Sequence, residues 1–236
     1  MRSLVARVVL VALGSVAAGA SAQNQPAPAG AGSDVYHVHF TKAAPGKAGE
    51  LGKALMVPDS TTPMPDHFVV LRHQEGDSWD YVVIQHLGQK AAVTAGPPPA
   101  NAARDLRAWH NDTFVSGPSW DEFSRQMGIG GSGTAGAVYT VGVHSAVPGH
   151  RDALEKALNQ AAPGDSKIQT GAVFMQHLEG GDWNFLAITR YNSWQDFATD
   201  RAAAVASPTA AGGWADIRQH SAFHRDTIAD RIFPAK

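Results

Sequence analysis

Two stretches of the chain match closely: HQEGDSWDYVVI at His73–Ile84 and HLEGGDWNFLAI at His177–Ile188. In each, a run rich in β-forming residues leads into a short turn with Gly and Asp, and a second such run follows. Gly and Asp in a short loop between two β-rich runs are typical of a β-hairpin. The sequence therefore predicts the same hairpin twice, once in each half.

Two further matches lie on either side of the hairpins, in the same order. VYHVHFTKAAPGKAGELGKAL (35–55) aligns without a gap with VYTVGVHSAVPGHRDALEKAL (138–158), and WHNDTF from Trp109 aligns with FHRDTI from Phe223. Three collinear matches indicate an internal repeat with a period near half the chain. The Gly-rich segment 128–136 is typical of a flexible connector, so we place the repeats at 34–127 and 137–234.

Each repeat shows the same predicted order of elements. Strands at 35–41 and 138–144 lead into helices at 46–56 and 149–160, and the hairpins follow at 67–87 and 172–191. A second helix, which begins after Ser193 in the second repeat and is interrupted near SPTAAGG, precedes the final strands DEFSRQM (121–127) and TIADRIF (227–233). The order βαββαβ is that of the ferredoxin-like unit, whose helices cover one face of the sheet. We therefore predict an α+β fold in which two ferredoxin-like repeats pack their bare sheet faces together as one pseudo-dimeric α+β barrel.

These paired units with EGD-W hairpins resemble the dimeric α+β barrel superfamily, especially antibiotic-biosynthesis-monooxygenase-like domains. The resemblance covers about residues 34–234 and rests on architecture rather than on a catalytic signature. It implies a superfamily whose members include cofactor-independent oxygenases, haem-degrading enzymes, isomerases, dye peroxidases and proteins with no known activity. The fold is thus a weak guide to the reaction.

The N-terminal segment is typical of an export signal. Arg2 and Arg7 precede the apolar run VVLVALGSVAAGA, and the small residues before Gln23 form a cleavage site. We predict a signal peptide at 1–22, a flexible spacer at 23–33 and a periplasmic or secreted mature protein. A retained N-terminal anchor is the alternative.

Composition narrows the classes of partner. Removing the signal segment deletes two Arg and no acid, which takes the net charge from −2 to −4. A mild acidic excess without a basic block argues against nucleic acid, and against a membrane after cleavage. The chain has no Cys, which excludes thiol catalysis. Exposed strand edges could still pair into an oligomer.

Histidines are the main candidates for chemistry, and the sequence has 11 of them. Strand alternation puts His37 and His39 on the face opposite Tyr36, Val38 and Phe40. If the apolar face meets the helices, both imidazoles face the barrel interior, where they could bind haem or a divalent metal or act as a general base near pH 7. We predict His37, His39 and His224 as catalytic residues.

A wider set of polar and aromatic side chains could line the same interior. The predicted ligand-pocket residues are His86, His110, His144, Trp79, Trp183 and Arg190. Structural roles are the alternative for several of them. A Trp at the base of a hairpin is commonly a packing residue, the paired His73 and His177 can bond to turn backbone, and His110 and His224 can mark a junction between a helix end and the final strand.

Common catalytic and metal-binding motifs are missing from the sequence, including H-E-x-x-H, G-x-S-x-G, Walker and dinucleotide fingerprints. We therefore assign no metal ligand, and the cofactor stays open, with haem or a divalent metal as candidates. The predicted function is an exported binding protein for a hydrophobic or aromatic small molecule. One alternative is a cofactor-independent or haem-dependent oxygenase that acts on an aromatic or polyketide-like substrate. The other is a non-catalytic structural or stress-related module.

Overall fold

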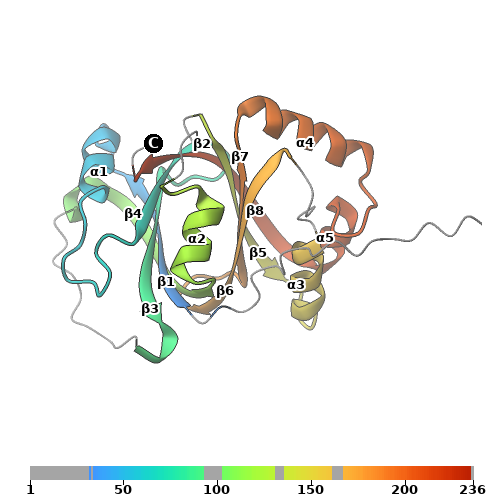
Figure 1. Ribbon diagram of the computed structural model, residues 1–236, viewed down its shortest axis with the longest axis horizontal. Helices are drawn as coiled ribbons and strands as arrows, with labels where there is room; N and C mark the ends of the chain where they lie inside the picture. The colour runs from blue at the N-terminus through green and yellow to red at the C-terminus, as the bar shows by residue number, and fades with distance from the viewer. Residues whose placement is uncertain (1–31, 33, 93–102, 131–135, 161–166, 235–236) are drawn as a thin grey trace, which may run out of the picture.

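Eight antiparallel strands form a closed barrel in the computed structural model, which describes residues 32, 34–92, 103–130, 136–160 and 167–234 (Figure 1). The strands are β1 (Asp34–Ala43), β2 (Phe68–Glu75), β3 (Tyr81–Gln89), β4 (Arg107–Gly117), β5 (Val138–Ala146), β6 (Gln169–Glu179), β7 (Phe185–Tyr191) and β8 (Ser221–Phe233). The helices of the described residues are α1 (Ala48–Leu55), α2 (Trp120–Met127), α3 (Arg151–Gln160), α4 (Trp194–Ala206) and α5 (Trp214–His220), with short 3₁₀ turns at η1 (Lys90–Ala92) and η2 (Arg104–Leu106). The α+β class predicted from the sequence is confirmed.

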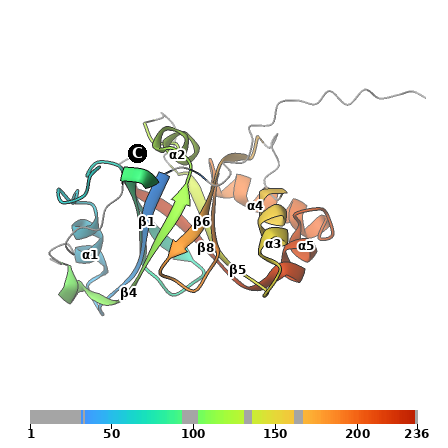
Figure 2. The same cartoon turned by 90° about the horizontal axis from the view of Figure 1, so that it is seen from below.

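The two halves of the chain contribute equivalent sets of strands. Around the barrel the order is β1-β3-β2-β8-β5-β7-β6-β4, so β4-β1-β3-β2 from the first half faces β8-β5-β7-β6 from the second. The halves are joined where β2 pairs with β8 and where β4 pairs with β6. Helix α1 flanks one side of the barrel, and α3, α4 and α5 flank the other (Figures 1 and 2).

The barrel interior holds the main hydrophobic core. Tyr36, Val38 and Phe40 of β1 point inward and meet buried side chains from all the other strands, such as Val115 of β4 and Tyr139 of β5. Each strand alternates between this interior and the outside, as a period of two requires. Burial of these apolar side chains is the main favourable term for closing the barrel.

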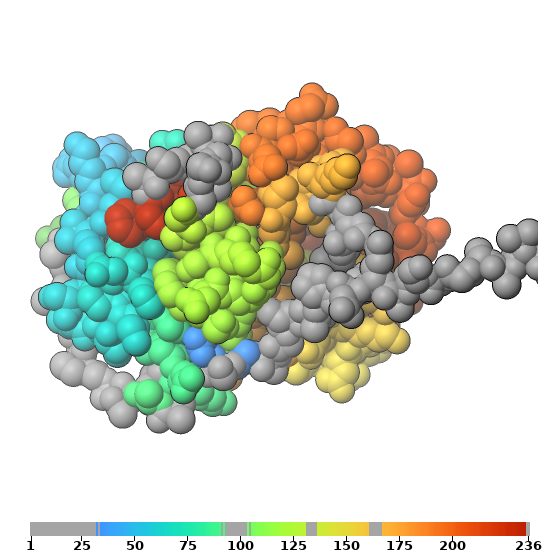
Figure 3. All heavy atoms as spheres, in the orientation of Figure 1, coloured from blue at the N-terminus to red at the C-terminus, as the bar shows by residue number. Residues whose placement is uncertain are grey.

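Helix α2 closes one part of this core and corrects the sequence prediction. We predicted residues 121–127 as a final strand, but they form α2, and the strand before it is β4. Ser119 caps the helix by accepting a hydrogen bond from the Glu122 amide, and Gly128 ends it in a left-handed conformation. This Ser-x-x-Glu pattern followed by Gly is a helix signal that the repeat alignment overrode. Phe123 and Met127 pack into the barrel core, and α2 lies between the two halves on the face shown in Figure 3.

Several other predicted elements agree with the structure, but the second helix predicted for the first repeat is not among them: the described residues there form 3₁₀ turns at Lys90–Ala92 and Arg104–Leu106, and residues 93–102 lie outside the described part of the chain. Ser193 caps α4 by accepting a hydrogen bond from the Asp196 amide, and the helical region breaks after Ala206 before α5 begins. The predicted final strand at 227–233 lies within β8. His110 and His224, however, lie inside β4 and β8 rather than at a helix–strand junction, because residues 107–117 form a strand that was not predicted and β8 begins earlier than predicted.

The two EGD hairpins dock on opposite halves of the molecule. The Gly181 amide of the β6–β7 hairpin donates a hydrogen bond to the Thr113 hydroxyl of β4 at 3.0 Å. In the same way, the Asp77 amide of the β2–β3 hairpin donates to the Thr227 hydroxyl of β8 at 3.3 Å. Both threonines are buried. The matched hairpins and the matched H-x-D-T segments therefore bind each other across the junctions of the barrel.

The hairpin glycines fit these contacts only because they lack a side chain. A Cβ atom on Gly180 would lie 2.3 Å from the carbonyl oxygen of Asp112, and one on Gly76 would lie 2.3 Å from that of Asp226. Both glycines also have positive φ, at 111° and 122°. Close backbone approach and left-handed geometry together require glycine at these turns.

The predicted signal peptide and nearly all of the predicted spacer lie outside the described residues. The connector at 128–136 is described only at its two ends, where Gly128, Gly130 and Gly136 have positive φ. Among the described residues, the helices are too short or too polar to cross a membrane.

The hairpin contact can be tested with two matched glycine substitutions. Gly180→Ala places a Cβ against backbone atoms, whereas Gly149→Ala imposes a comparable positive φ (84°) with no atom within 4 Å. We expect Gly149→Ala to cost about 1–3 kcal/mol of unfolding free energy from backbone strain. Gly180→Ala should cost roughly 1–3 kcal/mol more from the clash. Urea unfolding measures both values, and equal losses would show that the hairpin contact is unimportant.

Candidate functional site

The predicted inward orientation of His37 and His39 is wrong. Their apolar neighbours Tyr36, Val38 and Phe40 fill the barrel, so the two imidazoles lie on its outer face. Strand alternation was predicted correctly, but the choice of face was not. A closed barrel places its most apolar face inside, because those side chains lose the most by remaining in water.

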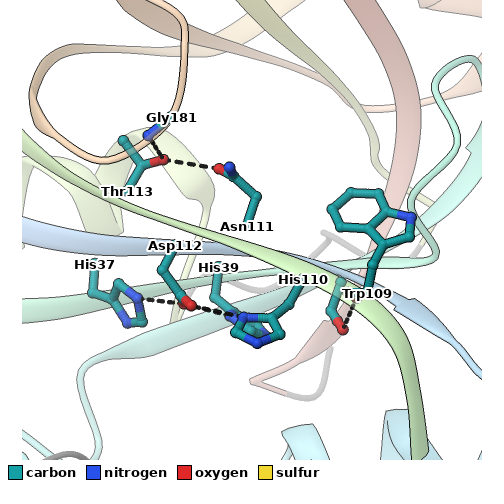
Figure 4. A network of polar contacts seen from close by, with 9 residues as sticks. His37, His39, Trp109, His110, Asn111, Asp112, Thr113 and Gly181 are labelled. Atoms are coloured by element: carbon teal, nitrogen blue, oxygen red, sulfur yellow. Dashed lines mark hydrogen bonds and ion pairs between the residues drawn. The ribbon is translucent and has the colours of Figure 1, made fainter.

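On the outer face, three imidazoles surround one carboxylate. His37 Nε2 lies 2.8 Å from Asp112 Oδ1, and His39 Nδ1 lies 2.6 Å from the same oxygen. His110 Nδ1 lies 2.7 Å from the other oxygen, Oδ2. Figure 4 shows the three rings turned toward Asp112, while Asn111 and Thr113 turn toward the hairpin that carries Gly181. We call His37, His39, His110, Asp112 and Phe114 the β1–β4 patch.

Strand register assembles the β1–β4 patch. His39 is paired with Asp112 across β1 and β4, His37 with Phe114, and Thr41 with His110. Directly paired residues project from the same face, so the side chains from both strands meet. Asp112 was not among our predicted site residues. The sequence feature that could have indicated Asp112 is the aspartate that the matched segments WHNDTF and FHRDTI share.

Charge is distributed unevenly within the patch. Burial alone would raise the pKa of Asp112, but the hydrogen bonds from His37 and His39 outweigh it and hold that pKa far below its usual range. Burial lowers the pKa of His39, and the neighbouring Arg107 and His37 add to the decrease, although Asp112 opposes it. At neutral pH the patch therefore contains an ionised carboxylate beside a neutral His39.

The β1–β4 patch also offers an aromatic surface. The ring of Phe114 stacks on His37 with centroids 5.1 Å apart, and Phe114 is 38% exposed. The His37 side chain is 31% exposed, whereas that of His39 is only 8% exposed. His37 is thus a partly exposed imidazole that contacts both Asp112 and the apolar face of Phe114.

A second cluster contains His224 and His144. Their rings stack with centroids 5.8 Å apart, and His224 Nε2 lies 3.4 Å from Asp226 Oδ2. Asp226 is the counterpart of Asp112 in the repeat alignment, and Gly142 is the counterpart of His39. A Cβ on Gly142 would meet Asp226 Oδ1 at 2.8 Å and His144 Nε2 at 2.9 Å. The predicted catalytic residues are therefore divided between two places on the barrel surface.

The predicted pocket residue His86 belongs to a third cluster, beneath α2. His86 Nε2 lies 2.9 Å from Asp34 Oδ2, and its Nδ1 lies 3.1 Å from His67 Nδ1. Trp120 stacks on the His67 ring at 4.5 Å. We did not predict Asp34, His67 or Trp120 as site residues, because they reach His86 from the start of β1, from the segment before β2 and from α2.

The remaining predicted pocket residues have structural contacts. Trp79 and Trp183 are buried in the barrel core, where the edges of His73 and His177 meet them. Arg190 donates hydrogen bonds to the carbonyl oxygens of Gln126 and Thr170. The alternative packing role of the tryptophans agrees with these positions.

Haem fits these positions poorly. A porphyrin needs a slot into which an axial imidazole points, but the barrel interior is filled by the apolar core. On the outside, the Nε2 atom of His37 and the Nδ1 atom of His39 are directed at Asp112.

The buried His144 should make stability depend on pH. Burial lowers the pKa of His144 to about 4 from its ordinary 6.5. Between these values the unfolded chain binds more protons than the folded one, so stability is retained above pH 6.5 and falls as the pH decreases toward 4. The full effect is on the order of 3 kcal/mol.

His144→Gln should therefore lose less stability than the unmodified protein between pH 7 and pH 4.5. Urea unfolding across this pH range measures the difference. His150→Gln, at an exposed position, is the control, and identical pH slopes for His144→Gln and the unmodified protein would contradict the assignment.

Comparison with known proteins supports the architecture. No family model matches the chain, and no curated protein matches it. An anthrone oxidase-like protein is structurally similar, with a TM-score of 0.58 and 15% identity over 85% of this chain and 92% of that one. A "putative monooxygenase" from Fusobacterium nucleatum subsp. nucleatum gives a TM-score of 0.51 with 8% identity over 85% and 93% of the two chains. A similarly described protein from Lactobacillus acidophilus gives 0.49, with 9% identity over 84% and 94%. The chain shares its α+β fold with the anthrone oxidase-like protein and with the Fusobacterium protein.

Proposed function

We propose that this protein is an exported, small-molecule-binding protein of the monooxygenase-like α+β barrel type, and that its ligand binds at the β1–β4 patch. The observation that carries the proposal is the pair formed by His37 and Asp112, next to the exposed ring of Phe114. Small-molecule sites combine apolar surface with a few oriented polar groups, and the β1–β4 patch offers both.

The ligand class follows from these contacts. When Nε2 of His37 donates its proton to Asp112, Nδ1 carries the lone pair and can accept a proton from a ligand. Phe114 offers a face on which a second ring can stack. A planar aromatic molecule with an acidic hydroxyl or an acidic C–H group satisfies both contacts.

A catalytic role is a second candidate, and the name of the anthrone oxidase-like neighbour favours it. An enolisable aromatic ketone, deprotonated by His37, is electron-rich enough to react with O₂ directly. Oxidation of a ring CH₂ to C=O by one O₂ releases one water, so the substrate supplies all the electrons. His37 and Asp112 would hold the abstracted proton, and His39, neutral beside Asp112, would keep the carboxylate oriented. A non-catalytic structural or stress-related module is the remaining reading.

We also propose that the barrel arose from a tandem duplication of a ferredoxin-like unit, with repeats at 34–127 and 137–234. The reciprocal contacts of Thr113 and Thr227 support this origin. So do the matched bonds in which Asp80 accepts from the Ala43 amide and Asn184 accepts from the Ala146 amide, both at 2.7 Å. In the same proposal, each of the two repeats corresponds to one domain of the antibiotic-biosynthesis-monooxygenase-like type.

Binding can be tested by titrating the metal-free protein with a hydroxylated anthrone under anaerobic conditions, where the enolate and its parent differ in absorbance. We expect saturable binding that His37→Gln and Phe114→Ala each weaken at least tenfold. Trp214→Ala removes a ring that is 64% exposed on α5, away from the patch, and should leave binding unchanged. Absence of saturable binding, or equal losses in all three variants, would refute the ligand site. Admitting O₂ then reports whether the bound molecule is oxidised.

Export has its own test. Expression of the whole chain in a bacterial host should give a soluble periplasmic protein whose intact mass corresponds to an N-terminus at Gln23. Arg2 and Arg7 replaced together by Glu should reduce export, since the positive charges orient the signal. An uncleaved mass in the membrane fraction would instead support a retained anchor.

A further inference from the structure

We infer that the β1–β4 patch is a binding site for a divalent transition-metal ion, with His37 Nε2, His39 Nδ1 and Asp112 Oδ1 as ligands. One ligand atom from each of these three residues lies within 4.8 Å of the others, and both imidazoles contact Asp112 Oδ1 directly. Two imidazoles and one carboxylate on one side of an ion form the facial arrangement used for divalent transition metals. A search for local sequence motifs could not reveal this ligand set, because Asp112 is far from His37 and His39 in the sequence, although β4 lies next to β1 in the barrel.

The spacing of the ligand atoms suits an ion after a small adjustment. The imidazole nitrogens lie 2.8 and 2.6 Å from Asp112 Oδ1. In a site with metal–ligand bonds of 2.0–2.2 Å, neighbouring ligand atoms are separated by about 3.0–3.5 Å. Side-chain rotations that lengthen these contacts by a few tenths of an ångström would therefore replace two hydrogen bonds with metal bonds.

The surroundings hold the ligands in place. His37 and His39 project from the same face of β1, and Asp112 is paired with His39 on the neighbouring strand. His110 Nδ1 contacts the second carboxylate oxygen at 2.7 Å, which leaves Oδ1 directed at the other two rings. Such a partner behind a ligating carboxylate fixes its orientation. Among the residues that the structure describes, the buried Nε2 atom of His39 has no hydrogen-bond partner, whereas Nδ1 contacts Asp112.

The ligand set selects the class of ion. Imidazole nitrogens suit Zn²⁺, Co²⁺, Ni²⁺ or Fe²⁺, whereas Mg²⁺ and Ca²⁺ prefer sites built from oxygen alone. The side chains of His37 and Asp112 are 31% and 39% exposed, so the remaining coordination positions face solvent. A ligand oxygen could occupy one of them.

Metal binding does not rest on the proposed aromatic ligand. If the ion and the aromatic molecule bind together, the deprotonated oxygen of that molecule would bind the ion, and His37 would serve as a metal ligand instead of accepting the proton. The two proposals fail separately, since one is tested with the metal alone and the other with metal-free protein.

The second half of the chain supplies a matched control. Asp226 occupies the place of Asp112, but Gly142 stands where His39 would be. His144 and Asp226 close the space above Gly142. Thr140 likewise stands where His37 would be, so Asp226→Asn makes the same chemical change as Asp112→Asn at a position without either imidazole ligand.

The experiment uses tag-free mature protein, treated with a chelator, dialysed and titrated with Co²⁺ by absorbance and with Zn²⁺ by calorimetry. We expect one ion per chain and a d–d spectrum of nitrogen and oxygen ligands. Asp112→Asn and His37→Gln should each weaken binding at least tenfold, and Asp226→Asn should not. Circular dichroism confirms that each variant is folded, and the half-exposed His37 provides the test if Asp112→Asn does not fold.

Three outcomes would overturn the site. The unmodified protein could bind no Co²⁺ or Zn²⁺ at micromolar concentration. The folded Asp112 and His37 variants could bind as tightly as the unmodified protein. Finally, Asp226→Asn could abolish binding while His37→Gln retains it, which would place the ion in the second half of the chain.

Discussion

The docking of each EGD hairpin on a threonine of the opposite half is the contact on which the rest of the structure depends. Thr113 and Thr227 are buried, and each accepts an amide hydrogen bond from a hairpin that approaches so closely that only glycine fits. These contacts lie at the two junctions where strands of different halves pair. Without them, each sheet would leave an apolar face and two strand edges in water.

The same constraint positions the candidate site. Asp112 immediately precedes Thr113, so strand alternation directs its side chain to the opposite face. The hairpin therefore fixes the backbone of β4 from one side, and the carboxylate meets His37 and His39 on the other. The Asp112–Thr113 segment of β4 therefore takes part both in barrel closure and in the β1–β4 patch. The patch is built on paired strands and contains no loop residue.

The two halves keep the framework and differ in chemistry. Tyr36 and Tyr139 are both buried in the core, and the paired threonines and glycines serve equivalent contacts. On the outer face, His39 in one half corresponds to Gly142 in the other, where His144 lies across the gap instead. The core residues and the hairpin glycines and threonines contact both halves of the barrel, so a substitution at one of them affects both halves. A substitution on the outer face affects fewer contacts. The first half therefore carries three imidazoles around Asp112, whereas Asp226 in the second half has His224 beside it and Gly142 across the strand pair.

The sequence by itself determined the α+β class, the order of most elements, the hairpins with their glycines and the alternation of His37 and His39 with Tyr36, Val38 and Phe40. These features depend on local periodicity, turn chemistry and self-similarity, all of which are visible in one dimension. Only the tertiary structure decided which face of β1 lies inside, because that choice depends on how eight strands share one apolar interior. It also decided that the helix at 120–127 packs against that interior, and that Asp112 lies opposite His39. The contacts of Asp112 with His37 and His39 join residues more than seventy positions apart, and no local pattern encodes such a register.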